Sequence, residues 1–304
     1  MVLRASGSRW RLALAAALLA LLGGCSLVGI AYENADLWLL HEAEDYVALR
    51  PAQRDQLKVA LKNRLEQHRT RELPRYVEFL DEALAAASDG LTPTEVETLL
   101  GRLQGLAAEL VAGTVPPVAA ALAGLDDAQR AQLAERLRAG DRRYEEDYVL
   151  PARDARLAKR AKAARKQLAH WTGDLTPGQR ERVAELVRAW PDVAGRWLAY
   201  RKGRTDGLVA LLQRGAGKAE IERYLESRWV RHEGQPADLE RDVAATRSGI
   251  VALVVALDGS LSPAQRKALL DRIRGYRADL AALLPRGAPV VATTAPPEAA
   301  AVRP

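Results

Sequence analysis

The chain has 304 residues, of which 48% are apolar, 28% charged and 5% aromatic. This composition is typical of a folded globular protein and excludes a disordered chain or one with many membrane spans. The single cysteine cannot form an internal disulfide, and together with four histidines it is too little for zinc-finger or iron–sulfur clusters. We therefore predict no metal, no cofactor and no disulfide framework.

The segment 1–24 has the pattern of a lipoprotein signal peptide. Three arginines precede an unbroken run of leucine and alanine from Leu12 to Leu22, which is shorter than the roughly 20 residues that a membrane-spanning helix needs. The run ends at Leu22-Gly23-Gly24-Cys25, which resembles the bacterial lipobox. The resemblance implies cleavage before Cys25 and acylation of its thiol, which would anchor the mature protein stably to a membrane. The alternative is an ordinary cleaved signal peptide that leaves a free cysteine.

The residue after the cysteine bears on where the protein is located, and the net charge bears on its partners. Ser26 in place of aspartate resembles lipoproteins that continue to the outer membrane, so we expect a protein of the cell envelope that faces the periplasm. Removal of residues 1–24 takes away three arginines and no acid, which lowers the formal net charge from +6 to +3. A nucleic-acid-binding protein is normally far more basic, so we expect no nucleic-acid partner.

Aromatic and apolar residues follow the cysteine closely, in the sequence from Tyr32 to Leu40. The favoured interpretation is that Trp38, Leu39 and Leu40 pack in the core. The alternative is that Tyr32 and Trp38 lie at the level of lipid headgroups, where aromatic residues are enriched.

The early part of the chain also carries a family resemblance. Its motifs are Cys25, Tyr32-Glu33-Asn34-Ala35-Asp36, the helix start at Gln53-Arg54, and His68-Arg69-x-x-Glu72-Leu73-Pro74-x-Tyr76. In these motifs the chain resembles a family of uncharacterised proteobacterial lipoproteins. The resemblance implies a helical, lipidated envelope protein and brings no activity with it.

Apolar residues recur at helical spacing almost throughout, and no segment alternates as a strand would. The clearest stripe contains Val96, Leu99, Leu100, Leu103, Leu106, Ala107 and Leu110. We therefore predict an all-α fold.

The predicted helix starts repeat one pattern. Leu91-Thr92-Pro93-Thr94-Glu95, Leu175-Thr176-Pro177-Gly178-Gln179 and Leu261-Ser262-Pro263-Ala264-Gln265 each combine an N-cap hydroxyl, an N1 proline and an N3 Glu or Gln, which is a capping box. Weaker copies begin at Leu49, Leu125 and Ala216. The irregular spacing favours a bundle of about eight to ten helices over a solenoid of repeated hairpins. The same starts are weakly similar to periplasmic stress chaperones with Leu-Thr-x-x-Gln motifs.

Glycines and prolines predict where helices stop. We expect Gly113, Pro116 and Pro117 to end the helix that starts at Pro93, and one helix to run over 141–171. We expect residues 25–284 to form a single helical periplasmic domain, and the Pro- and Ala-rich segment 285–304 to be a disordered tail.

The latter part of the predicted 141–171 helix is strongly basic. It carries Arg153, Arg156, Lys159 and Arg160, followed by Lys162, Arg165 and Lys166. One hypothesis is that this face binds anionic lipid, lipopolysaccharide or cell-wall polymer. The favoured alternative is a solvated helix face whose cations complement the helix dipole.

A second candidate surface combines arginine with aromatic residues, as protein-binding hot spots and sugar-binding sites do. Its members are Arg196, Trp197, Tyr200, Arg201, Lys202, Tyr224, Arg228, Trp229 and Arg231. The favoured alternative is that Trp197 and Trp229 fill the core.

No catalytic signature is found. His68 and Glu72 lie four residues apart on one helical face, but no third ligand or nucleophile is near them in the sequence, so a surface or half-buried polar pair is the expected role. We therefore expect a binding or chaperone-like interaction module for envelope proteins, not an enzyme. The alternative is a structural or ligand-binding lipoprotein that acts through the basic helix.

Overall fold

The computed structural model describes residues 27–285. These residues are helical, with no strand among them, so the predicted all-α, multi-helix fold is confirmed. The predicted signal peptide, Cys25 and almost the whole predicted tail lie outside the described residues. The helices are α2 (Leu27–Glu33), α3 (Ala35–Tyr46), α4 (Pro51–Gln67), η1 (His68–Glu72, a π-helix), α5 (Leu73–Asp89), α6 (Pro93–Ala123), α7 (Asp127–Tyr148), α8 (Arg153–Thr172), α9 (Pro177–Arg188), α10 (Ala194–Gln213), α11 (Lys218–Leu225), η2 (Glu226–Val230, a π-helix), α12 (Ala237–Asp258) and α13 (Pro263–Ala282).

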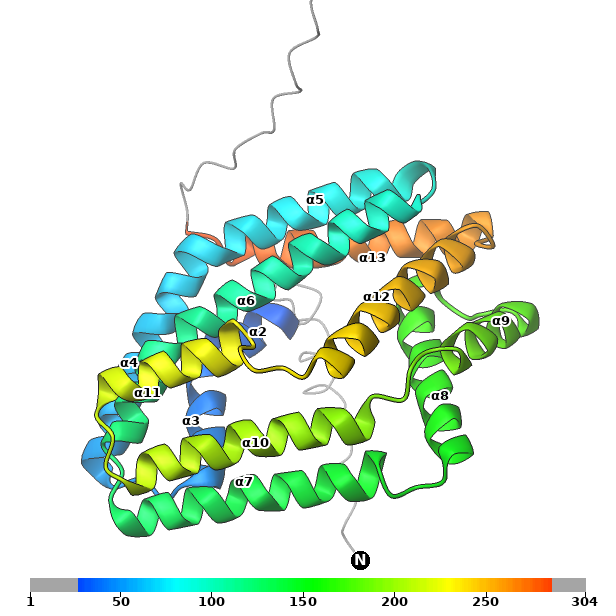
Figure 1. Ribbon diagram of the computed structural model, residues 1–304. Helices are drawn as coiled ribbons and strands as arrows, with labels where there is room; N and C mark the ends of the chain where they lie inside the picture. The colour runs from blue at the N-terminus through cyan, green and yellow to red at the C-terminus, as the bar shows by residue number, and fades with distance from the viewer. Residues whose placement is uncertain (1–26, 286–304) are drawn as a thin grey trace, which may run out of the picture.

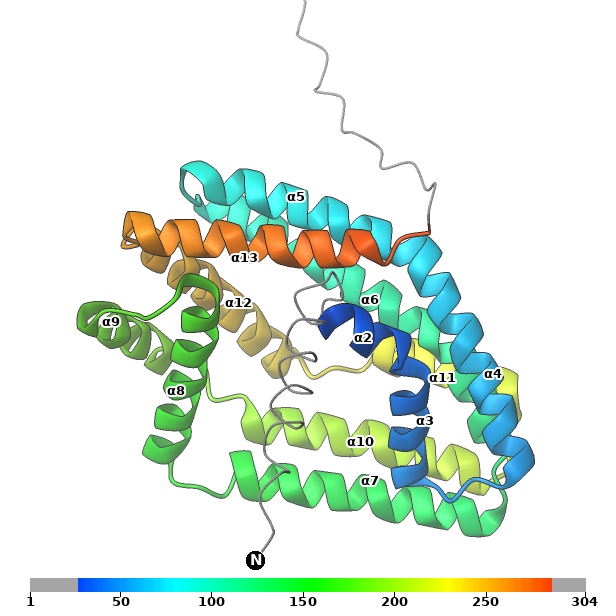
Figure 2. The same ribbon diagram turned by 180° about the vertical axis from the view of Figure 1, so that it is seen from behind.

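The helices follow one another around a closed, ring-like outline (Figure 1). The helices α5, α6, α12 and α13 form one side of this ring, and α7 pairs with α10 on the opposite side. The helices α8 and α9 connect the two sides at one end, whereas α3, α4 and α11 lie at the other. Seen from behind, α2 and α3 lie on the face that α13 also occupies (Figure 2).

The capping boxes act as predicted and also join distant helices. The caps of α6, α7, α9 and α13 each accept the N3 backbone N–H through the side chain of Thr92, Asp126, Thr176 or Ser262. The N3 glutamines of α9 and α13, Gln179 and Gln265, also exchange amide hydrogen bonds of 3.0 and 2.9 Å. Gln53 of α4 and Gln129 of α7 form a second pair of this kind.

The core has two main clusters. One joins α6, α7, α10 and α11 through residues such as Ala119, Leu212 and Ile221. The other joins α8, α9 and α12 through residues such as Val183 and Val187. Trp229 packs against the first cluster, as the core interpretation of this residue requires.

The predicted end of the helix that starts at Pro93 is wrong. The helix α6 continues through Pro116 and Pro117 to Ala123, because Val115 and Ala119 are buried in the first cluster and this packing outweighs the lost hydrogen bonds. Arg64 and the hydroxyl of Thr114 donate to carbonyls just before the prolines, those of Leu110 and Val111.

Two further expectations also fail. The single helix expected over 141–171 is two helices, because the chain breaks at Pro151 between α7 and α8, where the proline disfavours helical geometry in the residue before it. Trp38 and Leu39 are also not core residues, since they are 69% and 46% exposed; of the three apolar residues there only Leu40 is buried.

Candidate functional site

Two of the basic residues of α8, Arg156 and Arg160, contact the segment that connects α9 to α10. We call this contact region the joint. Arg156 forms an ion pair with Asp192 and donates to the carbonyl of Pro151 at 2.6 Å. Arg160 lies 3.9 Å from the Asp192 carboxylate and donates to the carbonyl of Pro191 at 3.0 Å. These two arginines therefore hold the chain around Asp192 in place, while Arg153 is exposed.

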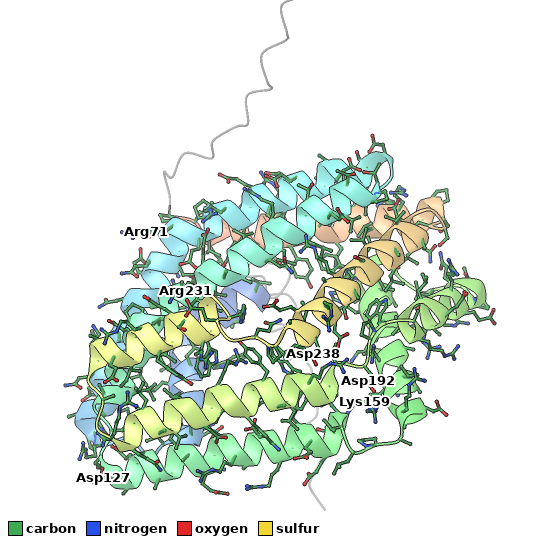
Figure 3. The ribbon with its side chains drawn as sticks, in the orientation of Figure 1. Arg71, Asp127, Lys159, Asp192, Arg231 and Asp238 are labelled. Carbon is green, nitrogen blue, oxygen red and sulfur yellow. The ribbon has the colours of Figure 1, made fainter. Side chains whose placement is uncertain are left out.

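A cleft of about 370 Å³ opens at this joint. Lys159 lies on its wall, with its ammonium 4.1 Å from the centre of the Tyr148 ring and 3.4 Å from Asp147. Figure 3 shows Lys159 and Asp192 close together on this side of the ring. The cleft is lined mainly by Tyr144, Tyr148, Arg156, Lys159, Arg160, Trp190 and Asp192. It thus combines aromatic rings with three cations and two acids, Asp147 and Asp192.

The surroundings of Asp192 at this joint favour the charged form of its carboxyl group. The hydrogen bond from Arg156 is the main cause that holds the pKa of Asp192 below its ordinary value, and the charges of Arg156 and Arg160 add to it. The carboxylate of Asp192 therefore neutralises part of the positive charge of Arg156 and Arg160, which leaves less charge for a ligand in the cleft.

The predicted arginine–aromatic cluster comes together, but around a residue that the sequence analysis did not single out. Arg204 of α10 is buried, and its guanidinium carbon lies 5.4, 4.7 and 5.0 Å from the ring centres of Trp197, Tyr200 and Trp229. It donates to the carbonyl of Arg228 at 3.2 Å. Burial lowers the pKa of Arg204. The only sequence signal for it was its position four residues after Tyr200.

The other members of this cluster are engaged elsewhere. Arg196 forms ion pairs with Asp238 and Asp242 of α12, and Arg201 forms an ion pair with the buried Asp141 of α7, with 2.7 Å between Nε and Oδ1. Tyr224 donates to the carbonyl of Arg204 at 2.9 Å. Several members of the predicted surface are thus engaged in contacts within the fold, although only Tyr200 of the nine is buried.

His68 and Glu72 belong to a buried polar network at the π-helix η1. Arg64, which is 7% exposed, pairs with Glu72 at 2.7 Å. The Tyr32 hydroxyl donates to the carbonyl of Leu65 at 3.0 Å and lies 2.9 Å from Nδ1 of His68. Because the single hydroxyl proton goes to that carbonyl, Nδ1 of His68 donates to Tyr32.

This network fastens α2 to the junction of α4 and α5. Burial lowers the pKa of His68, although the charge of Glu72 opposes the shift, so the ring is neutral at pH 7. The Nε2 atom of His68 lies 3.8 Å from Glu72, too far for a hydrogen bond. The motif that carries the family resemblance therefore encodes a structural joint.

An apolar groove of about 430 Å³ lies beside this network. Its walls come from α5, α6 and α13, with Trp171 at the end of α8, and almost all of the lining atoms are apolar. The hydroxyl of Tyr276 is hydrogen-bonded to His170 at 2.9 Å. The lining consists of Tyr76, Phe79, Leu80, Leu103, Leu106, Ala107, Leu110, Trp171, Tyr276 and Leu280.

The groove explains why the predicted stripe of α6 is only partly buried. Val96 and Leu106 are buried, whereas Leu103 and Leu110 are 50% and 39% exposed. In residues 27–285, α6 is also the one helix that is long and apolar enough to cross a membrane by length and composition. Sequence analysis used this stripe to predict a helix and did not identify the groove.

Residues 27–285 contain no candidate metal site. No group of three or more His, Cys, Asp or Glu side chains among the described residues could hold a metal ion.

Comparison with known proteins identifies a family whose function is unknown. Residues 45–228 match a family of unknown function (DUF6279), a stretch longer than half of the chain. No curated protein and no solved structure matches. Arguments about function therefore depend on the geometry of this chain.

Proposed function

The chain belongs to DUF6279, a family of unknown function, and we propose from its own geometry that it is a lipid-anchored binding protein for long hydrocarbon chains. The apolar groove between α5, α6 and α13 carries this proposal. We further propose that the protein faces the periplasm from the outer membrane, is held there by acyl chains on Cys25, and has no catalytic role.

The chemistry of the groove supports a hydrocarbon ligand over an extended peptide. A peptide brings N–H and C=O groups, each of which costs free energy when it is buried without a partner. The hydroxyl of Tyr276 is already engaged by His170, and the rest of the lining is almost entirely apolar. A hydrocarbon chain needs no such partner and gains about 0.8 kcal/mol for each methylene that it buries.

The size of the groove also fits a small ligand. Its volume of about 430 Å³ lies within the range of roughly 300 to 1,000 Å³ that is usual for small-molecule sites. A chaperone-like role on the arginine–aromatic cluster has less support, because Tyr200 and Arg204 are buried in the fold.

The test is a titration of the full-length protein with cis-parinaric acid, whose fluorescence rises in an apolar site. Ala107 lines the groove and is exposed, so Ala107→Trp fills the groove without crowding the core and should abolish the fluorescence rise. Ala108 is the next residue of the same helix, is exposed and is not part of the lining, so Ala108→Trp should bind the probe like the unmodified protein.

Equal binding by both variants, or no binding by the unmodified protein, would contradict the proposal. Displacement of the probe by an unfolded polypeptide, and not by unlabelled fatty acid, would instead favour the chaperone-like role.

The cleft at α8 favours a second candidate function, the binding of an anionic envelope saccharide such as lipopolysaccharide. Lys159 lines this cleft, whereas Lys162 is exposed on the same helix outside it. We expect Lys159→Glu to weaken binding of lipopolysaccharide at low salt and Lys162→Glu to leave it unchanged. Binding that is equal in the two variants, or insensitive to salt, would exclude this site, because exposed charges are screened.

A further inference from the structure

The first turn of α3 exposes a group of large apolar side chains. Leu37, Trp38 and Leu39 are 48%, 69% and 46% exposed, and Ile30 of the preceding α2 is 45% exposed. Consecutive residues of a helix point in different directions, about 100° apart. The side chains of Leu37, Trp38 and Leu39 therefore cover the exposed side of α3 at nearly one level, and we call these three residues the apolar collar.

Polar residues follow the collar on α3. His41, Glu42 and Asp45 are exposed, before the exposed Tyr46 at the end of the helix. At 1.5 Å per residue, Asp45 lies about 10 Å along the helix from Trp38. Leu40 and Asp36 face inward and are buried, so α3 is fixed to the rest of the protein.

The collar lies close to the point where the chain is tethered. The helix α2 begins at Leu27, two residues after Cys25, and two residues span at most about 7 Å. Tyr32 fastens α2 to Leu65 and His68. There is thus no long linker between the tether and the folded domain, and α2 and α3 lie on one face of the ring (Figure 2).

We propose that the apolar collar inserts into the interface of a phospholipid bilayer, with Trp38 among the headgroups. This inference rests on the proposed anchoring at the N-terminal end of the domain. Tryptophan is enriched at this depth in membrane proteins. The bilayer then fixes the orientation of the whole domain, since α3 is packed on α4 and α7.

A second copy of the chain fits the apolar collar less well than a bilayer does. A symmetric dimer brings the same patch of both copies together. The exposed Glu33 and Glu42 flank the collar on its two sides, so a dimer would oppose like charges there, and such juxtaposition is costly.

The experiment measures quenching of Trp38 by lipid. The full-length protein is reconstituted in vesicles of phosphatidylcholine that carries bromine near the top of its acyl chains, and its fluorescence is compared with that of Trp38→Phe. We expect the emission assigned to Trp38 by difference to shift to shorter wavelength and to lose most of its intensity relative to vesicles without bromine.

A matched control moves the exposed tryptophan elsewhere. Leu150 is also 69% exposed and lies between α7 and α8, and α8 lies at the end of the ring away from α3 (Figure 1). In the double variant Trp38→Phe/Leu150→Trp the new tryptophan should stay accessible to acrylamide in water and should not be quenched by bromine.

Each outcome decides the inference. Quenching of Trp38 by acrylamide and not by bromine contradicts it, and protection from both quenchers indicates a protein partner or a second copy instead. The measurement serves whether acyl chains on Cys25 or an uncleaved N-terminal segment holds the chain, since both tether residue 27 to the bilayer. The mass of the reconstituted protein reports acylation separately, so failure of the proposed anchor is distinguishable from failure of the collar.

Discussion

Arg204 illustrates how this protein accommodates a buried charge. Among residues 27–285, no carboxylate forms an ion pair with it; three aromatic rings and one carbonyl surround the guanidinium instead. Each cation–π contact contributes about 0.5 to 2 kcal/mol, which offsets part of the cost of removing the charge from water. The aromatic residues of this cluster thus stabilise an internal cation.

His68 gives the protein a predicted sensitivity to acid. Burial lowers the pKa of His68 below its usual value of about 6.5, so the unfolded chain binds this proton more tightly than the folded one. The contribution of His68 to stability is therefore complete above about pH 6.5 and is lost as the pH falls through the folded-state pKa.

We expect His68→Gln to reduce this loss, because glutamine can donate to Tyr32 in place of the ring N–H but does not titrate. The check is the melting temperature of both proteins between pH 7.5 and pH 5. An identical decline in the two proteins would show that other groups cause the acid sensitivity.

At the scale of elements, the repeated helix starts do more than cap helices. Gln179 donates to Gln265 and to the carbonyl of Ser260, while Gln265 donates back to Gln179 and to the carbonyl of Asp174. Both glutamines are buried. The N3 residue of the capping box therefore also links two helix starts that lie far apart in the sequence.

We expect Gln179→Ala to destabilise the protein by about 1 to 3 kcal/mol, because it removes two hydrogen bonds from the buried amide of Gln265 and one from the carbonyl of Ser260. The double variant Gln179→Ala/Gln265→Ala should cost less than the sum of the two single changes. Denaturant unfolding of the four proteins measures this coupling. Strict additivity would contradict a direct link between the glutamines.

At the scale of the whole molecule, one buried acid helps to close the ring. Asp258 at the end of α12 accepts from the backbone N–H of Leu91 at 2.9 Å and from Arg266 at 3.0 Å. Arg266 in turn donates to the carbonyl of Ala87 at 2.8 Å. The turn between α5 and α6 is thus joined to the turn between α12 and α13.

We expect Asp258→Ala to cost about 3 to 5 kcal/mol, the range for breaking a buried ion pair on one side. Hydrogen exchange should rise in the α5–α6 and α12–α13 turns before it rises in α7 and α10, which lie on the opposite side of the ring (Figure 1). Uniform loss of protection would show that this joint has no local role. Asp271→Ala is a suitable control, because this acid pairs only with cations of its own helix, Lys267 and Arg274.

The sequence by itself determined the helical class and the capped helix starts, because these depend on local backbone chemistry and on periodicity. It also predicts a lipid anchor at Cys25, which lies outside the described residues. Only the tertiary structure decided that α6 passes through two prolines, since packing of Val115 and Ala119 outweighs the local preference. The same holds for the candidate sites. Helical periodicity places Leu103 and Leu110 on one face, but whether that face is core or groove depends on how closely α5 and α13 approach it. Likewise the exposure of Trp38 depends on which side of α3 meets α4, and this is a property of the assembled helices.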